Sequence, residues 1–261
     1  MRRSTRLKGV VASLAVIAGC STSGAPTHPS EPPSPSSWQQ VILLKADDFT
    51  CCPAQDRFAR FIGVIQRRSL RAGLGLIAKG LENTTQKDLL YLTQVVADGR
   101  FELWNHGYDH AILPATQRYE FCDSGYDLQR DRLRRAQDLV KSKLQLVMRA
   151  FGAPGNCFDA DTLRVINQDP DIETWVYGDP SSVKYVIVRN AEAEFGCTGC
   201  VNAAEFISRY DAAKSYLTLQ LHPKDWDDAQ FAEFERILDF LAGKPVRFVL
   251  PSEMKSLSGP T

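Results

Sequence analysis

The chain has 261 residues, which is enough for one large domain or two small ones. Its 31 basic and 31 acidic residues give a formal net charge of zero, a balance that does not favour nucleic-acid binding. The apolar stretch near the N-terminus, residues 10–18, is shorter than the ~20 residues that a membrane-spanning helix needs. We therefore expect no nucleic-acid partner and no transmembrane helix at that stretch.

The first 20 residues have the pattern of an export signal. Four basic residues within 1–8 precede the short apolar run. The run ends in Val16-Ile-Ala-Gly-Cys20, which resembles the lipobox of bacterial lipoproteins. This resemblance implies a signal peptide at 1–19 and a lipid anchor on Cys20, with the domain facing the periplasm or the outside. The alternative is an ordinary secretory signal with an incidental cysteine.

A Ser/Pro-rich segment separates this signal from the rest of the chain. Residues 20–37 contain no aliphatic side chain larger than alanine, so they cannot build a core and are predicted to form an extended tether. The remaining residues, 38–261, are expected to fold as one monomeric domain.

From residue 41 onward, short β-rich runs alternate with longer amphipathic segments. We expect strands at 41–46, 74–77, 101–104, 146–151, 174–177, 183–188, 216–221 and 246–250, and helices at 54–68, 126–144, 161–168, 202–210 and 229–242. A further helix begins after a capping box at 85–88 and ends at Gly99. This alternation predicts a parallel sheet covered by helices, either open or closed into a barrel, with ligands at the carboxyl ends of the strands.

Side chains suited to catalysis follow these strands. Asp47 and Asp48 follow the first strand, His106 and His110 follow the third, and His222 ends a late one. Two histidines four residues apart on a helical turn lie ~5–6 Å apart and can bind one ion. An aspartate completes the two-histidine, one-carboxylate set of hydrolytic metal enzymes. For the histidine pair alone, the alternative is the exposed face of a surface helix.

Three motifs together resemble the polysaccharide deacetylases of the NodB-homology group, carbohydrate esterase family 4. They stand in family order over about residues 41–250 and read Lys45-Ala-Asp-Asp-Phe49, Asn105-His-Gly-Tyr-Asp-His110 and Leu219-Gln-Leu-His222. The resemblance implies a distorted (β/α) barrel of parallel strands. It also implies a divalent metal ion, with Zn²⁺ as the default expectation from the ligand types.

The resemblance assigns a role to each motif residue. It makes Asp47 the catalytic base and His222 the acid that protonates the leaving group. The implied metal ligands are Asp48, His106 and His110. Adjacent residues of an extended chain point in different directions, which agrees with separate roles for the two aspartates.

Further residues are implied to contact the substrate. Leu221 is expected to line the acetyl pocket, and the backbone N–H near Gly155 to stabilise an oxyanion. Trp175 and Asp179 occupy the region of the family's fourth motif. For Trp175, core packing is the alternative to substrate contact.

Two positions depart from the family pattern. Gly107 stands where the family has Ser or Thr after the first histidine, although the spacing of the histidines is kept. In Phe151-Gly-Ala-Pro-Gly-Asn156, Gly152 stands where the family often has an arginine that steadies the base. Arg149 is a candidate substitute that could orient the base, and an ordinary solvated arginine is the alternative.

The resemblance implies hydrolysis of an N-acetyl, less often an O-acetyl, group on an extracytoplasmic polysaccharide. Two other hypotheses remain open. One is a non-catalytic lipoprotein that binds glycan or metal on the same scaffold, and the other is a metal-dependent hydrolase of a non-glycan amide. The complete set of base, acid and ligands favours the enzyme, while Gly152 favours the binding protein.

Six cysteines fall within the predicted domain, and an even number in an exported protein favours disulfides. Cys197-Thr-Gly-Cys200 has zinc-knuckle or redox spacing, but a tight disulfide loop is the preferred interpretation. The other four, Cys51, Cys52, Cys122 and Cys157, follow predicted strands on the active-site side. Disulfides among them could fix the surrounding loops, and the sequence leaves their pairing open.

Overall fold

The computed structural model describes residues 40–51 and 56–257. All described residues belong to one compact unit. The expected signal peptide, the lipid anchor on Cys20 and the tether lie outside the described residues and stay predictions. Within the described ranges, every helix is too short or too polar to cross a membrane.

Strands and helices alternate along the described chain. The strands are β1 (Gln40–Phe49), β2 (Ala72–Leu76), β3 (Phe101–Asn105), β4 (Ile112–Leu113), β5 (Arg118–Tyr119), β6 (Ala150–Phe151), β7 (Thr174–Val176), β8 (Tyr185–Ile187), β9 (Tyr216–Leu221) and β10 (Val246–Val249). The α-helices are α1 (Asp56–Arg67), α2 (Gln86–Ala97), α3 (Tyr126–Leu144), α4 (Ala160–Gln168), α5 (Ala203–Arg209), α6 (Asp228–Ala242) and α7 (Met254–Leu257). Short 3₁₀ turns are η2 (Ala78–Leu81), η3 (Pro154–Asn156), η4 (Pro223–Asp225) and η5 (Pro251–Glu253).

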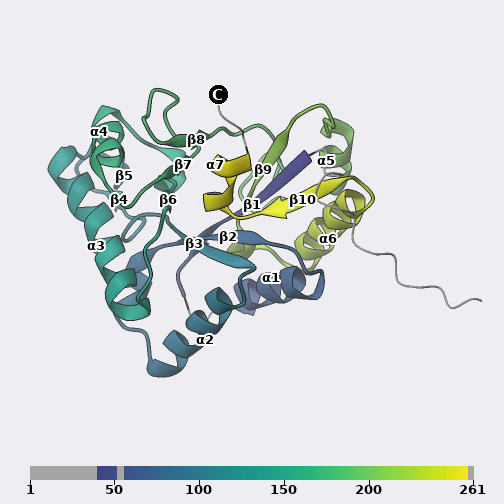
Figure 1. Ribbon diagram of the computed structural model, residues 1–261, viewed down its shortest axis with the longest axis horizontal. Coiled ribbons are helices and arrows are strands. Elements are labelled where there is room, and N and C mark those ends of the chain that lie inside the picture. The colour runs from purple at the N-terminus through teal and green to yellow at the C-terminus, as the bar shows by residue number, and fades with distance from the viewer. Residues whose placement is uncertain (1–39, 52–55, 258–261) are drawn as a thin grey trace, which may run out of the picture. The chain divides into compact units, whose positions relative to one another are not determined.

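The main sheet of the described residues has eight strands, and their pairings are parallel (Figure 1). The order is β10-β1-β2-β3-β6-β7-β8, and β9 also pairs with β1, along residues 41–46 of that strand. The side chain of Asn190, just after β8, bridges to β9: it donates to Tyr216 O at 2.9 Å and accepts from Thr218 N at 3.0 Å. The sheet thus curls into a distorted (β/α) barrel, as the resemblance implied.

The alternation of side chains along β1 separates the inside of the barrel from its outside. Ile42 and Leu44 belong to the large apolar cluster under the helices, while Leu43 packs with Trp104 and Tyr177 in a second cluster. Lys45 continues the Leu43 side of the strand, because residues two apart share a face. It is a charged side chain inside the barrel.

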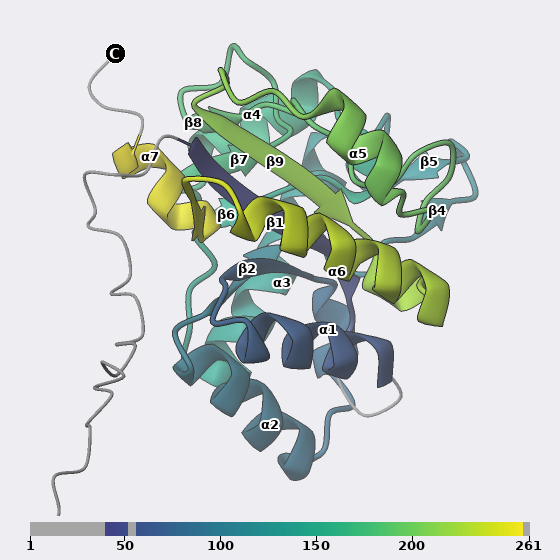
Figure 2. The ribbon, with the colours of Figure 1, turned by 90° about the vertical axis from the view of Figure 1, so that its right-hand side faces the viewer.

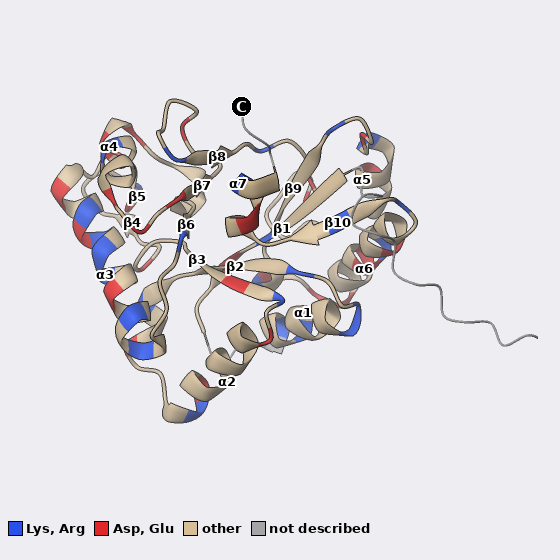
Figure 3. Cartoon of the chain, viewed as in Figure 1, with Lys and Arg blue, Asp and Glu red and all other residues tan. Residues whose placement is uncertain are grey.

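The outer face of the sheet is covered by amphipathic helices, and Figure 2 shows α1 and α6 side by side. Apolar residues at helical spacing, such as Phe58, Phe61 and Ile65 of α1, are buried there. Phe61 stacks against Trp226 and against Phe234 of α6. Charged residues of both signs lie along α3 (Figure 3), which leaves its polar face to solvent.

The predicted capping box before α2 is confirmed. Thr85 Oγ1 accepts from Asp88 N at 3.2 Å, and Thr85 N donates to Asp88 Oδ2 at 3.1 Å. A small antiparallel hairpin of β4 and β5 follows the loop that carries His106 and His110, and the sequence pattern did not predict it. It brings Tyr119 to the carboxyl ends of the strands.

Candidate active site

A bulge near the end of β1 places both aspartates in one cavity. Ala46 pairs with Leu74 of β2 and Phe49 pairs with Leu76, so Asp47 and Asp48 together oppose one residue. Asp48 has a φ of 63°, in the left-handed region that non-glycine residues seldom adopt. Bulges re-aim side chains next to active sites. This one turns two adjacent carboxylates, which a regular strand would point apart, toward the same space.

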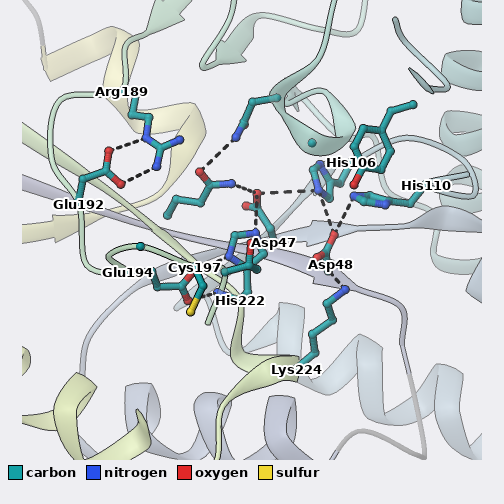
Figure 4. Close-up of a pocket in the computed structure, with 16 residues that line it drawn as sticks. Asp47, Asp48, His106, His110, Arg189, Glu192, Glu194, Cys197, His222 and Lys224 are labelled. Carbon is teal, nitrogen blue, oxygen red and sulfur yellow. Dashed lines mark hydrogen bonds and ion pairs between the residues drawn. The ribbon is translucent and has the colours of Figure 1, made fainter. Parts of the chain in front are cut away.

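The cavity has a volume of about 590 Å³ and lies at the carboxyl ends of the strands (Figure 4). Its polar walls come from β1, from the loop after β3, from the loop after β8 and from the end of β9. The lining residues are Asp47, Asp48, His106, His110, Tyr119, Gly155, Asn156, Arg189, Glu192, Glu194, Gly196, Cys197, Thr198, Gln220, His222 and Lys224.

Asp48, His106 and His110 form a group that could hold a metal ion, because their candidate ligand atoms lie within 4.8 Å of one another. Asp48 Oδ1 lies 3.3 Å from His106 Nε2 and 3.0 Å from His110 Nε2. The Nδ1–H of His106 donates to the carbonyl of Gly152 at 2.8 Å, which fixes the ring and leaves Nε2 free as a ligand. The structure therefore brings together the ligands that the sequence motifs indicated.

These residues fit a divalent cation. Asp48 Oδ1 is buried and lacks a hydrogen-bond partner among the described residues, and such an orphaned acceptor calls for a cation. Burial opposes the charge of the Asp48 carboxylate, but His106 and His110 outweigh burial and hold its pKa well below the usual range. Two imidazoles and one carboxylate suit Zn²⁺ and other divalent ions, and they leave coordination positions open.

The loop that carries the two histidines is not helical, so the expected helical turn is wrong. Gly107 has a φ of 81° and His110 a φ of 55°, and these two left-handed residues bend the chain so that both rings face Asp48. The backbone N–H of His110 donates to Glu120 Oε1 at 3.0 Å. Burial raises the pKa of Glu120 to about 7. The ring of His110 also lies against Tyr119, with 4.9 Å between the ring centroids.

Asp47 lies between this group and His222. Its Oδ2 is 3.9 Å from His106 Nε2 and 3.9 Å from His222 Nε2. Gln220 Nε2 donates to the same oxygen at 2.7 Å, and Lys45 Nζ contacts Oδ1 at 2.6 Å and Oδ2 at 2.5 Å. Burial lowers the pKa of Lys45, against the opposing effect of the Asp47 charge.

His222 is held by Glu194, a residue that sequence reasoning missed. The Nδ1–H of His222 donates to Glu194 Oε2 at 2.6 Å, so its Nε2 faces the cavity. Burial disfavours the imidazolium, but the carboxylates of Glu194 and Asp47 outweigh it and raise the pKa of His222. Glu194 lies in an irregular segment and forms only an isolated β-bridge with Val201 among the described residues. The sequence therefore has no strand or helix pattern there that would have pointed to Glu194.

Two of the side chains that were expected to contact the substrate do not line the cavity. Leu221 is fully buried in the apolar cluster under the helices, because residue 221 points away from the face of β9 that carries Gln220 and His222. Trp175 is also fully buried, between Phe151 and Phe158, which confirms the core-packing alternative. Gly155 does line the cavity, against the ring of Tyr119.

Arg149 does not orient the base. Its guanidinium is bonded to Glu173 at the other end of the sheet, is largely exposed and lies outside the cavity lining. The cation beside Asp47 is Lys45 instead. Asp179, from the same region as Trp175, is partly exposed and accepts a hydrogen bond from the Ser181 hydroxyl at 2.6 Å.

Two disulfides brace the cavity walls. The expected Cys197–Cys200 bond closes a tight loop whose Gly199 N–H donates to Glu194 Oε2 at 2.9 Å. A second bond joins Cys122 to Cys157 and ties the segment after Tyr119 to the segment after Gly155. Cys51 is also disulfide-bonded.

The chain thus folds as an eight-stranded parallel (β/α) barrel with an Asp-His-His group that could hold a metal ion and, beside it, a buried aspartate next to a histidine. No model of a protein family matches the sequence, and no curated protein matches it. Similar solved structures do exist. A family 4 acetyl xylan esterase from Clostridium thermocellum, in complex with a cobalt ion, is 14% identical, with a TM-score of 0.61 over 85% of this chain and 93% of that one.

Two further structures share the fold. The peptidoglycan deacetylase PdaC from Bacillus subtilis is 13% identical, with a TM-score of 0.58 over 85% of this chain and 93% of that one. A pseudoenzyme of carbohydrate esterase family 4 from Bacillus anthracis is 13% identical, with a TM-score of 0.56 over 80% of this chain and 63% of that one. The chain therefore has the fold of the NodB-homology structures of carbohydrate esterase family 4, as the sequence motifs implied.

Proposed function

We propose that this protein is a metal-dependent hydrolase that removes acetyl groups, chiefly the N-acetyl groups of amino sugars, from an extracytoplasmic polysaccharide. The observation that carries the proposal is the position of Asp47. One buried carboxylate lies at the same distance from a histidine of the candidate metal group and from the histidine held by Glu194. The similarity to deacetylases and to an acetyl xylan esterase supports the reaction class.

In this proposal the chain's residues divide the work of hydrolysis. Asp48, His106 and His110 would hold a divalent ion, which would supply Lewis-acid chemistry toward a carbonyl and a water molecule. Asp47, oriented by Lys45 and Gln220, accepts a proton from the attacking water. His222, protonated and oriented by Glu194, donates a proton to the departing sugar amine. The backbone near Gly155 faces the same cavity and could donate to the developing oxyanion.

The location is part of the proposal. The export signal and the lipobox-like Val16–Cys20 would anchor the domain to a bacterial membrane through a lipid, next to envelope polysaccharides. The cavity of about 590 Å³ has charged and polar walls, which suit a hydrated sugar. We propose Zn²⁺ as the ion, from the two imidazoles and one carboxylate.

The test measures acetate released by the full chain from an N-acetylglucosamine hexamer and from O-acetylated xylan, with and without a chelator. Asp47→Asn is expected to keep the bound metal and to lower acetate release by ~10²–10⁴-fold. His106→Ala is expected to lose both metal and activity. Full activity of Asp47→Asn would show that the base is another residue.

A non-catalytic glycan-binding protein is the competing hypothesis. The specific observations in its favour are Gly152, where the family often has arginine, and the pseudoenzyme among the similar structures. It predicts that the wild-type chain binds the metal and the hexamer but releases no acetate, whether or not the chelator is present.

A further inference from the structure

Lys45 is a buried cation inside the barrel, directly behind the candidate base. Its side chain is 1% exposed and that of Asp47 is 2% exposed. The two residues lie two apart on β1, so both point to the inside of the barrel. An ammonium group is costly to bury unless it is paired and hydrogen-bonded. Here it contacts both oxygens of the Asp47 carboxylate.

Two aromatic rings hold this ammonium group in place. Lys45 Nζ lies 4.8 Å from the ring centroid of Trp104 and 4.9 Å from that of Tyr177, both within the range of cation–π attraction. Trp104 fits there because two neighbouring positions are glycine. A Cβ atom would lie 2.4 Å from the Trp104 ring at Gly75 and 2.8 Å from it at Gly152.

The other basic side chains of the cavity lining have carboxylate partners of their own. Arg189 is bonded to Glu192 through both Nε and Nη2, and Lys224 pairs with Asp48 Oδ2 at 2.9 Å. Lys45 lies behind the lining residues and pairs with Asp47.

We propose that Lys45 is the positioning residue of the candidate base, fixing the Asp47 carboxylate between His106 and His222 from inside the barrel. This inference rests on the proposed function. The ammonium group grips both oxygens, and Gln220 holds Oδ2, so the carboxylate has three polar contacts from two directions. The aromatic clamp of Trp104 and Tyr177 fixes the ammonium group itself. Gly152, which leaves room for Trp104, is thereby part of the same arrangement.

The test compares Lys45→Met with the wild-type full chain on the N-acetylglucosamine hexamer. We expect kcat to fall ~100-fold or more, because a small misplacement of a catalytic group has effects of that size. KM and the number of metal ions per chain should not change, because Lys45 is neither on the cavity wall nor among the metal-binding group. Lys45→Arg should recover part of the kcat. Lys143→Met, at the exposed end of α3, is the matched control and should behave like the wild type.

A second variant keeps the inference testable if Lys45→Met folds poorly. Because Lys45 acts through Asp47, adding Lys45→Met to Asp47→Asn should raise the melting temperature and change the residual kcat less than twofold. A further large loss of kcat in the double variant overturns the inference, as does a wild-type kcat in Lys45→Met. If the wild-type chain releases no acetate from either substrate, the proposed function is wrong and the inference about Lys45 is wrong with it. If the wild type is active and Lys45→Met is equally active, only the inference about Lys45 is wrong.

Discussion

Glu194 holds His222 at two points. One carboxylate oxygen accepts the ring Nδ1–H of His222 at 2.6 Å, and the other accepts its backbone N–H at 2.7 Å. The carboxylate is itself fixed by Trp226 Nε1 at 2.9 Å and by the Gly199 N–H at 2.9 Å. Four donors from three residues thus fix the carboxylate and with it the direction in which the imidazole faces Asp47.

This pairing predicts the alkaline limb of the pH–rate profile. Glu194 raises the pKa of His222, so the imidazolium that would act as the acid in the proposed mechanism persists to higher pH than an isolated histidine would allow. Glu194→Gln keeps the size of the side chain and removes the charge, so the pKa of His222 should fall. The alkaline limb of kcat should then move to lower pH, which a series of acetate-release rates from pH 5 to 10 would detect. An unmoved limb would mean that His222 is not the acid.

Sequence reasoning missed Glu194 for a physical reason. The segment from Val188 to Asn202 is almost free of regular structure, and its shape is set by side-chain bonds and by the Cys197–Cys200 loop. Neither hydrophobic periodicity nor motif spacing reports such contacts. The role of Lys45 was also missed, because a strand pattern does not report which charged group a buried lysine contacts inside the barrel.

Other parts of the site were readable from the sequence. The β-α alternation predicted the parallel sheet, and the strand-end rule brought Asp48, His106, His110 and His222 to one edge. The error at Leu221 was avoidable, because on a strand the residue that shares a face with His222 is Gln220. The bulge at Asp47-Asp48 was not readable, since its register depends on the pairing of β1 with β2.

Gly107 is predicted to be required by the loop that carries His106 and His110. It has a φ of 81°, and a Cβ atom there would lie 2.1 Å from Glu120 Oε1. Gly107→Ala should therefore lower the melting temperature and weaken Zn²⁺ binding, because the displaced loop carries His106 and His110. Gly99→Ala is the matched control: its φ is 74°, with nothing within 4 Å of the added carbon, so it isolates the backbone strain of ~1–3 kcal/mol. Equal effects of the two changes would show that the contact with Glu120 is unimportant.

The Cys122–Cys157 and Cys197–Cys200 disulfides are predicted to have different effects. Cys122–Cys157 closes a loop of 35 residues and should contribute about 4 kcal/mol by restricting the unfolded chain, whereas Cys197–Cys200 closes a loop of 3 and should contribute less. Replacing Cys122 and Cys157 by serine should thus lower the melting temperature more. Replacing Cys197 and Cys200 should act mainly on kcat, because the loosened loop carries the Gly199 N–H that orients Glu194. Calorimetry and acetate-release rates on the two double variants would check this, and the reverse ranking on either measurement would contradict it.

Metal binding is predicted to stabilise the domain and to compete with Lys224. The buried Asp48 Oδ1 faces two imidazole nitrogens, so adding Zn²⁺ to the chelator-treated chain should raise the melting temperature, by a gain of ~2.7 kcal/mol at a hundred times the dissociation constant. Asp48→Asn should abolish the rise, while Asp47→Asn should keep it.

Lys224→Met should tighten Zn²⁺ binding, because Lys224 Nζ lies 2.9 Å from Asp48 Oδ2 and neutralises the carboxylate that the ion needs. Calorimetric titration of the three variants with Zn²⁺ tests both predictions. An unchanged binding isotherm in Asp48→Asn would mean that the ion binds elsewhere. Weaker binding in Lys224→Met would mean that Lys224 supports the site and does not compete with the ion.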